Sequence, residues 1–332
     1  MKVNSIEKKD ISFNGFWNSK GVKNMLSFAS DSGALFAATT TLVLSSTVRP
    51  LAVWATPETD SENKKIACAK YISSGICEFL LTLAVSLPIV SALKRIDKSP
   101  QKYLQQKSIN FIKDGAENIA DSKTYSLMTQ LFKLGVGFMV VLPKAVLTTL
   151  GIPYVLDKYF KTKYAPENNE LKSEKETSSG LTFQGKGSEN LAKGIGNILD
   201  NKSLQEFSKK YKDSNFPLHI FTLKDILATG AFIYQANNNK KINDEQKPFL
   251  IKNSIISTAL SIFSTYTIDK LTDKFAQNIK QKIITENKND PKLAKYLEGF
   301  KIIKPIVIMS AVYYTIIPFV STYLAQRAER NK

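Results

Sequence analysis

The sequence predicts an all-α protein, a multi-pass membrane helical bundle built from two homologous three-helix units. Three observations lead to this prediction. Apolar residues gather into six long blocks, stretches rich in Lys, Asn, Asp and Glu separate these blocks, and a short signature occurs twice. A repeated order of elements is typical of an internal duplication. Apolar blocks separated by polar loops distinguish a membrane protein from a soluble protein of the same average hydropathy.

The repeated signature is a Phe-x-Gly sequence followed by Lys-Gly and an apolar stretch. Ile-Ser-Phe-Asn-Gly and Lys-Gly-Val-Lys-Asn-Met-Leu in the first half match Leu-Thr-Phe-Gln-Gly and Lys-Gly-Ile-Gly-Asn-Ile-Leu in the second. The signature residues are Phe13, Gly15 and Gly21, and then Phe183, Gly185 and Gly194. We expect each copy to form a turn and a short amphipathic helix, because glycine permits backbone conformations that other residues avoid. A docking role is the alternative.

This repeat sets the predicted domain boundaries. A polar N-terminal tail covers 1–10, and the first helical membrane unit covers 11–160. The second unit covers 181–327 and is followed by a basic C-terminal tail at 328–332. Between the units, 161–188 is polar, charged and poor in apolar residues, and it overlaps the second signature at 181. This composition predicts a flexible linker.

The first unit contains apolar blocks at 33–56, 71–93 and 134–156. They are too long for strands, and none alternates apolar and polar residues with a period of two, so each block predicts a helix. A helix needs about 20 apolar residues to cross a hydrocarbon core of about 30 Å. The second and third blocks meet this length, whereas Arg49 and Pro50 interrupt the first.

The second unit repeats the order with blocks at 226–236, 253–268 and 305–325. Its last block has no charged residue, and its first block is too short to span by itself. Four or six spans are therefore both compatible with the sequence. Three spans per unit would invert the second unit relative to the first, as in many transporters.

The distribution of lysines favours parallel units. Lysines crowd the segments between the second and third blocks of each unit, at 94–123 and 270–301. The positive-inside rule places both segments on one side of the membrane, which requires an even number of crossings per unit. The polar helical stretches at 100–130 and 274–299 either lie on the membrane surface or pack on the rest of the protein.

The net charge of +17 indicates an anionic partner surface. The lysines lie mostly between apolar blocks and no predicted helix carries a dense arginine face, so anionic lipid headgroups are favoured over nucleic acid. We therefore expect the lipid bilayer of the cell membrane as the principal partner, with no nucleic acid. Assembly into a homo-oligomer remains open.

Three isolated charges stand inside apolar blocks: Arg49, Glu78 and Lys144. Ionisable groups within a membrane helix are costly and face partners or water. Arg49 and Glu78 stand at similar distances from the turn that joins their blocks, so we expect these two side chains to pair. Such a pair either locks the helices together or takes part in binding or conducting an anion or a proton.

The sequence does not predict an enzyme. It contains one histidine, His219, and its two cysteines, Cys68 and Cys77, are too far apart on one predicted helix for a disulfide. The stretch 180–186 begins like a phosphate-binding loop, but Gly187 stands where Ser or Thr should hold magnesium. We therefore expect no catalytic residues, no cofactor and no metal site.

Two functions remain compatible with these observations. The repeat and the isolated charges favour a transporter or channel for a small solute or ion. The plain composition of the second unit favours a non-transporting membrane scaffold whose basic loops lie at the lipid surface.

We predict that the protein stays in the membrane pellet after an alkaline carbonate wash and is released by detergent. The reason is the long, almost uncharged runs at 71–93 and 305–325, which prefer a hydrocarbon environment. Immunoblotting of the pellet and the supernatant measures this distribution. Recovery of folded protein in the carbonate supernatant would contradict integral insertion.

Overall fold

The computed structural model describes residues 15–161, 186–214 and 216–331. All regular elements in these ranges are helical and no strand forms there, which confirms the all-α prediction. Phe13, Phe183 and Gly185 lie outside the described residues, as do the predicted tail at 1–10 and almost all of the linker.

The first half contains long helices joined by short ones. Its elements are α1 Lys20–Ser46, α2 Val48–Trp54, α3 Ser61–Leu81, the π-helical turn η1 Thr82–Ser86, α4 Leu87–Lys98, α5 Pro100–Tyr103, α6 Gln106–Lys113, the 3-10 turn η2 Ile119–Asp121, α7 Lys123–Met139 and α8 Val141–Phe160. α3, η1 and α4 form one continuous helical rod, whereas α1 is kinked at Ser32, where the backbone leaves helical geometry.

The second half has fewer and longer elements. They are α9 Lys186–Leu199, α10 Lys202–Tyr211, α11 Phe216–Asn238, α12 Lys247–Glu286, α13 Leu293–Ala311, the π-helical turn η3 Val312–Ile316 and α14 Ile317–Arg330. The 40 residues of α12 extend well beyond the apolar block at 253–268, and α14 includes most of the predicted C-terminal tail. The helices are longer than the apolar blocks because tertiary contacts also stabilise their polar ends.

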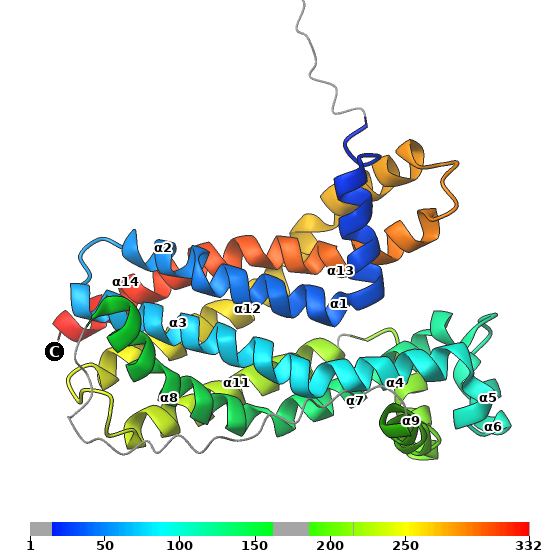
Figure 1. Ribbon diagram of the computed structural model, residues 1–332, viewed down its shortest axis with the longest axis horizontal. Helices are drawn as coiled ribbons and strands as arrows, with labels where there is room; N and C mark the ends of the chain where they lie inside the picture. The colour runs from blue at the N-terminus through cyan, green and yellow to red at the C-terminus, as the bar shows by residue number, and fades with distance from the viewer. Residues whose placement is uncertain (1–14, 162–185, 215, 332) are drawn as a thin grey trace, which may run out of the picture.

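Long helices lie side by side in an elongated bundle, here called the body, and two lobes project from one of its ends (Figure 1). Within the body, α1 packs on α13, α3 and α11 pack on α8, and α12 packs on α14. The contacts of α1 with α13 and of α8 with α11 cross between the halves of the sequence. The core of the body likewise joins Ile66 and Leu156 of the first half to Phe249 and Ala325 of the second, all almost fully buried.

The first lobe, the α4–α7 lobe, is formed by α4, α5, α6, η2, the start of α7, and α9 with α10. Ile96, Ile112, Ile119 and Met128 form its core together with Leu199 of α9. The polar stretch at 100–130 thus uses its apolar side chains for packing within the protein. Of the two expected positions for this stretch, the structure shows the packed one.

A charged cluster fastens α10 to this lobe. The carboxylate of Asp114, just after α6, accepts hydrogen bonds from Lys212 and from the hydroxyl of Thr124, and Lys209 lies 3.3 Å away. These contacts, chiefly the hydrogen bond from Lys212, lower the pKa of Asp114 to about 2. The carboxylate therefore stays ionised through the acidic range and holds α10 against α6 and α7.

The second lobe, the α12–α13 lobe, is formed by the end of α12, the start of α13 and the first part of α1. Val22 and Leu26 of α1 pack there against Ile283, Tyr296 and Phe300. The helix that carries the first signature therefore docks on the second half of the chain.

The helix that carries the second signature, α9, docks on the first half of the chain. Ile195 and Leu199 of α9 are buried in the α4–α7 lobe, which otherwise belongs to the first half. Glycines permit both close approaches. A Cβ on Gly196 of α9 would lie 2.2 Å from the carbonyl oxygen of Tyr103, and one on Gly299 of α13 would lie 1.9 Å from that of Leu26.

Both halves follow the same order of directions. α1 leads from its lobe along the body, α3–η1–α4 returns to the lobe end, and α7–α8 leads away again; α11, α12 and α13–η3–α14 repeat this sequence (Figure 1). The lysine-rich segments at 94–123 and 270–301 lie at the same end. Consequently α8 ends in the body core, with Leu156, while α9 begins at the lobe end.

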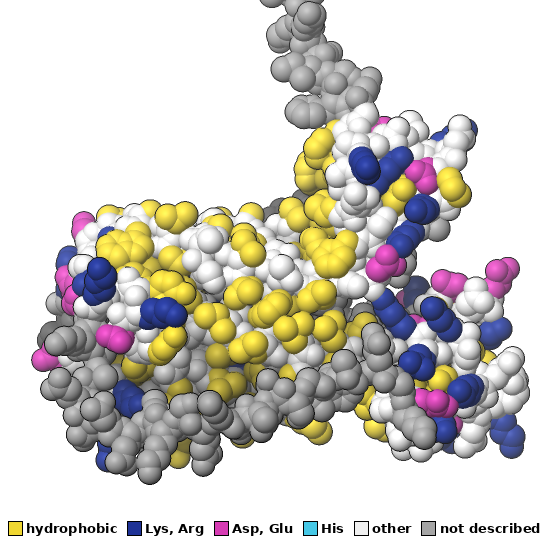
Figure 2. Space-filling model, viewed as in Figure 1, with side chains coloured by type: hydrophobic (Ala, Val, Ile, Leu, Met, Phe, Trp, Pro, Cys, Tyr) yellow, Lys and Arg dark blue, Asp and Glu magenta, His cyan; other side chains and the backbone are white. Residues whose placement is uncertain are grey.

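The visible face of the body is largely apolar in its middle, and charged side chains gather at its two ends (Figure 2). Large apolar side chains on the outside of the body include Leu80, Leu150, Phe263 and Val307, each more than half exposed. Contiguous exposed apolar surface of this kind marks contact with protein or lipid.

We predict opposite effects of two alanine substitutions in α9. Gly196→Ala should destabilise the protein by about 1–3 kcal/mol, because the new methyl group would overlap the backbone at Tyr103. Gly194→Ala meets no atom within 4 Å and should stabilise it by about 0.5–1 kcal/mol, since alanine favours a helix over glycine. Thermal unfolding of the detergent-purified chain measures both. Equal shifts would contradict the docking of α9 on the α4–α7 lobe.

Candidate functional site

Two of the three isolated charges meet inside the body. The carboxylate of Glu78, on α3, accepts a hydrogen bond from the ammonium group of Lys144, on α8. Their side chains are 40 % and 33 % exposed, so the pair is neither in bulk water nor sealed in the core. The remaining exposure is toward a cavity that the two helices enclose with α11.

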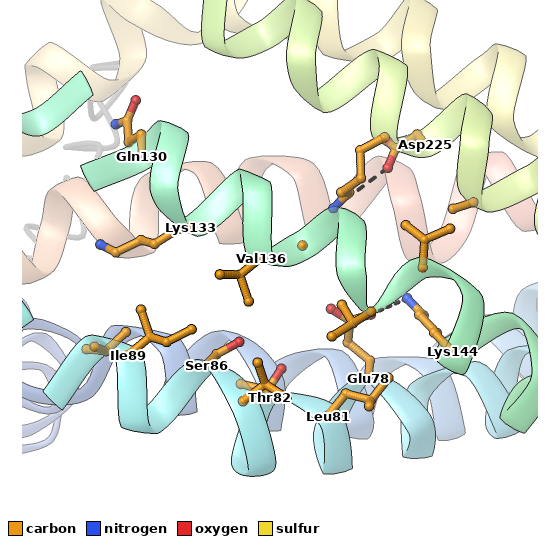
Figure 3. Close-up of a pocket in the computed structure, with 17 residues that line it drawn as sticks. Glu78, Leu81, Thr82, Ser86, Ile89, Gln130, Lys133, Val136, Lys144 and Asp225 are labelled. Atoms are coloured by element: carbon orange, nitrogen blue, oxygen red, sulfur yellow. Dashed lines mark hydrogen bonds and ion pairs between the residues drawn. The ribbon is translucent and has the colours of Figure 1, made fainter. Parts of the chain in front are cut away.

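This cavity has a volume of about 360 Å³. It is called the larger cavity here, because a smaller one adjoins it. Figure 3 shows the Glu78 carboxylate and the Lys144 ammonium facing each other, with Asp225 on α11 nearby. Lys224 lies 3.9 Å from Asp225, and Lys133 of α7 lines the far part of the cavity. The charged lining is two carboxylates and three ammonium groups, so the cavity carries a formal excess of one positive charge.

A π-helical turn forms part of the cavity wall. Thr82 and Ser86 of η1 line the cavity, and Pro88 is the second residue after the turn. Proline has no N–H group and its ring crowds the carbonyl group four residues earlier, so the helix widens before it. π-Helical turns of this kind often occur at functional sites.

Arg49 does not form the ion pair that the sequence analysis expected. Its Nε donates to the carbonyl oxygen of Tyr313, at 3.1 Å, and its guanidinium lies over the rings of Tyr71 and Tyr314, 5.0 and 4.5 Å from their centroids. The expected pair is wrong because matching depth along two helices does not fix the direction in which each side chain points. Glu78 faces α8, and Arg49 faces η3.

The hydrogen bond from Arg49 to the Tyr313 carbonyl is explained by Pro318, which has no N–H group. In η3 the N–H of Ile317 bonds to the carbonyl of Val312, five residues earlier. The next bond of this pattern would join residue 318 to the Tyr313 carbonyl, but Pro318 has no N–H to donate. Arg49 supplies the missing donor, and an unsatisfied buried carbonyl would cost about 1–3 kcal/mol.

A smaller cavity of about 180 Å³ adjoins the larger one. Arg49, Lys70 and Tyr71 line it, and Lys144 lines both cavities. Lys70 donates to Asn253 and Ser254 at 3.2 and 2.8 Å. The ring of Tyr71 lies 5.2 Å from its ammonium group.

Asn253 is completely buried and holds two lining residues of this cavity, Lys70 and Tyr71. Its side-chain oxygen accepts from Lys70 and from the hydroxyl of Tyr71, and its amide nitrogen donates to Ser321 and Thr322. A fully used amide of this kind holds its neighbours in one arrangement. The network joins α3, α12 and α14.

Sequence reasoning missed most of the charged lining of the cavities. Lys70 and Asp225 stand just outside the apolar blocks at 71–93 and 226–236, whereas α3 and α11 continue past those edges. A signal was present in α3 and η1, where polar residues recur every fourth position. This stripe comprises Lys70, Ser74, Glu78, Thr82 and Ser86.

The described signature residues lie away from the cavities. Gly15 has a positive φ of 99° in the turn before α1, as expected for a glycine turn. Gly21 and Gly194 lie in the docked parts of α1 and α9, and a Cβ on either would meet open space. The described signature glycines therefore lie in or beside the docked helices and not at the cavities.

Within the described ranges, no group of three His, Cys, Asp or Glu side chains is arranged to hold a metal ion. His219 contacts the hydroxyl of Tyr266, at 2.7 Å. Cys68 and Cys77 are buried with free thiols.

Two helices in the described ranges are long and apolar enough to cross a membrane, Leu35–Trp54 and Ser61–Lys98. A third candidate is the pair Lys123–Met139 and Val141–Phe160, bent by 45°, if it forms one span. The second and third candidates carry most of the larger cavity. No protein-family model, curated protein or solved structure matches the chain.

We predict that Glu78→Gln and Lys144→Met each lower the free energy of unfolding by about 1–3 kcal/mol. Each change leaves one charge without its charge-assisted hydrogen bond in a partly desolvated cavity. The double variant should recover part of the loss, with a coupling energy above about 0.5 kcal/mol. Denaturation of the purified chain and its variants measures the cycle.

The matched control is the cycle of Glu78→Gln with Arg49→Gln, whose side chains have other partners. Its losses should be nearly additive. Additivity in the Glu78–Lys144 cycle, or stronger coupling in the control, would contradict the observed pairing.

Proposed function

We propose that the chain is a multi-pass integral membrane protein of the cell membrane that binds a small charged solute in the larger cavity and moves it along the body, as a transporter or a channel. The observation that carries this proposal is a charged cavity inside a helical body whose visible face is largely apolar in its middle (Figure 2). In a water-soluble protein the apolar residues would be expected inside and the charges outside. No catalytic step is part of the proposal.

The polar stripe of α3 and η1 supports a path along the body. From Lys70 to Ser86 it extends over about 24 Å of helix, comparable with a hydrocarbon core of about 30 Å. Lys144 borders both cavities and so connects the two parts of this path. Charges within membrane helices commonly mark the route of a substrate or an ion.

The reciprocal docking of α1 and α9 supports an internal duplication. Val22 and Leu26 are the signature positions that match Ile195 and Leu199. All four are buried, and each pair is buried in the lobe of the opposite half. We propose that the two halves descend from one three-helix unit and that each copy completes the core of the other.

The lysines at the lobe end support an orientation. Under the positive-inside rule this end faces the cytoplasm, where anionic headgroups attract the basic residues of both lobes. Nucleic acid has no part in the proposal, and each chain contains its own cavities without a second copy.

A second candidate function, a non-transporting membrane scaffold, is favoured by one observation. Helix α8 ends and helix α9 begins at opposite ends of the body (Figure 1), and the sequence between them is polar. If the body stood upright with every pass across the bilayer, the chain would have to return from the end of α8 to the start of α9, and a polar sequence crosses lipid only at a high cost. A scaffold lying along the membrane surface has no such requirement.

A flux assay separates the two candidates. Proteoliposomes of the full chain should take up at least one solute from a panel of chloride, phosphate, sulfate, acetate, sodium and glycine, at a rate that saturates. The double variant Glu78→Gln/Lys144→Met removes two charges without leaving either unpaired, and we predict that it loses at least 90 % of this uptake. Lys158→Met, an exposed lysine further along α8, should leave it unchanged.

Uptake by the double variant at the wild-type rate would exclude the larger cavity as the path. Absence of uptake across the panel, with protein shown by circular dichroism to be folded in the vesicles, would exclude transport of these solutes and favour the scaffold.

A further inference from the structure

We propose that the smaller cavity, between α2, α3, α8, α11 and α12, is a binding site for a tetrahedral oxyanion, a phosphate or sulfate group, and that Arg49 and Lys70 are its principal ligands. The inference rests on the proposed function, because it assigns an anionic solute to the path along the body. It concerns a different cavity and different side chains from those that the flux assay changes.

The first argument is charge. Arg49 and Lys70 both line this cavity, and their charged groups lie 5.0 and 5.2 Å from the centroid of the same Tyr71 ring. In the described part of the chain, neither has a carboxylate within ion-pair distance. Two cations that line one cavity without a counter-charge are unfavourable in a partly desolvated site. A bound anion removes this penalty.

The second argument is that both cations are held in place. Asn253 and Ser254 fix the ammonium group of Lys70, and the Tyr313 carbonyl fixes Nε of Arg49. The terminal nitrogens of Arg49 have no hydrogen-bond partner among the described residues, so its planar group can offer parallel donors to an anion. Arginine is the preferred residue for phosphate recognition because of this fork geometry.

The third argument is the rest of the lining. Ser74, Thr148 and Ser257 line the same cavity, and the carboxylates of Glu78 and Asp225 line the larger one instead. Hydroxyl groups donate to anions without adding charge. A volume of about 180 Å³ is below the roughly 300 Å³ of typical pockets for drug-sized ligands, so the cavity suits a small inorganic ion or a single headgroup.

Lys144 connects this site to the larger cavity. It borders both cavities while its ammonium group is paired with Glu78. An anion leaving Arg49 and Lys70 would therefore next meet Lys144. The two cavities would then be successive sites on one path, with Lys144 between them.

The test is binding to the full chain purified in a neutral detergent and a chloride-free buffer. Isothermal titration with sodium sulfate and with sodium phosphate, at constant ionic strength, should show one saturable site. Lys70→Met is predicted to weaken binding at least tenfold, which corresponds to about 1.4 kcal/mol, because one charge-assisted hydrogen bond is lost. Lys98→Met, an exposed lysine at the end of α4, should bind as the wild type does.

Arg49 is tested with Arg49→Lys, which keeps the charge but lacks the fork. Binding should weaken while thermal stability without anion stays within a few degrees of the wild type. A second arm replaces the free ions with nanodiscs containing either phosphatidic acid or only phosphatidylcholine. Lys70-dependent binding of the free ions, or of phosphatidic acid alone, supports the site and identifies whether the group is free or carried by a lipid.

The inference is overturned if neither source binds, or if Lys70→Met and Lys98→Met have equal effects. Its failure is distinguishable from failure of the proposed function. Flux without oxyanion binding at this cavity would leave transport standing and remove the site, whereas oxyanion binding without flux would leave the site standing and remove transport.

Discussion

The ion pair between Glu78 and Lys144 is the interaction on which the centre of this structure depends. Each is the only charged residue of its apolar block, and each would be costly there without a partner. Their pairing fixes α3 against α8 and keeps the space between them polar. The apolar surfaces of the same helices face outward or into the body core, so a charged cavity is preserved within an otherwise apolar bundle.

The two prolines that follow π-helical turns have a comparable organising effect. Each removes a backbone donor at a place where the helix has already widened. At η3 the freed carbonyl of Tyr313 takes up Arg49, and the rings of Tyr71 and Tyr314 support the same guanidinium. A local feature of α14 thereby determines where a charge on α2 lies, and with it the lining of the smaller cavity.

Each lobe contains a helix from the opposite half of the chain. α1 completes a core made by α12 and α13, and α9 completes one made by α4 to α7, with glycines at the closest approaches. Because each half buries its signature helix in the other, the halves share their cores instead of folding as separate bodies. This exchange explains why two copies of a short signature face different surroundings and yet bury the same positions.

The sequence by itself determined the helical class, the order of the long helices and the identity of the isolated charges. Those features follow from the length and spacing of apolar runs, which are local properties. The positive-inside rule also predicted that the two lysine-rich segments share one side, and they lie at one end of the body (Figure 1). The even number of crossings per unit inferred with it does not match the three passes that each half makes along the body. Tertiary structure alone decided that Glu78 faces Lys144 and that Arg49 faces the Tyr313 carbonyl. The side chains of a helix point in all directions around its axis. Which of them contact a neighbouring helix depends on how the two helices are rotated about their axes. For the same reason the sequence did not single out Lys70 and Asp225. Both stand at the edges of apolar blocks in the sequence, but they line cavities inside the bundle.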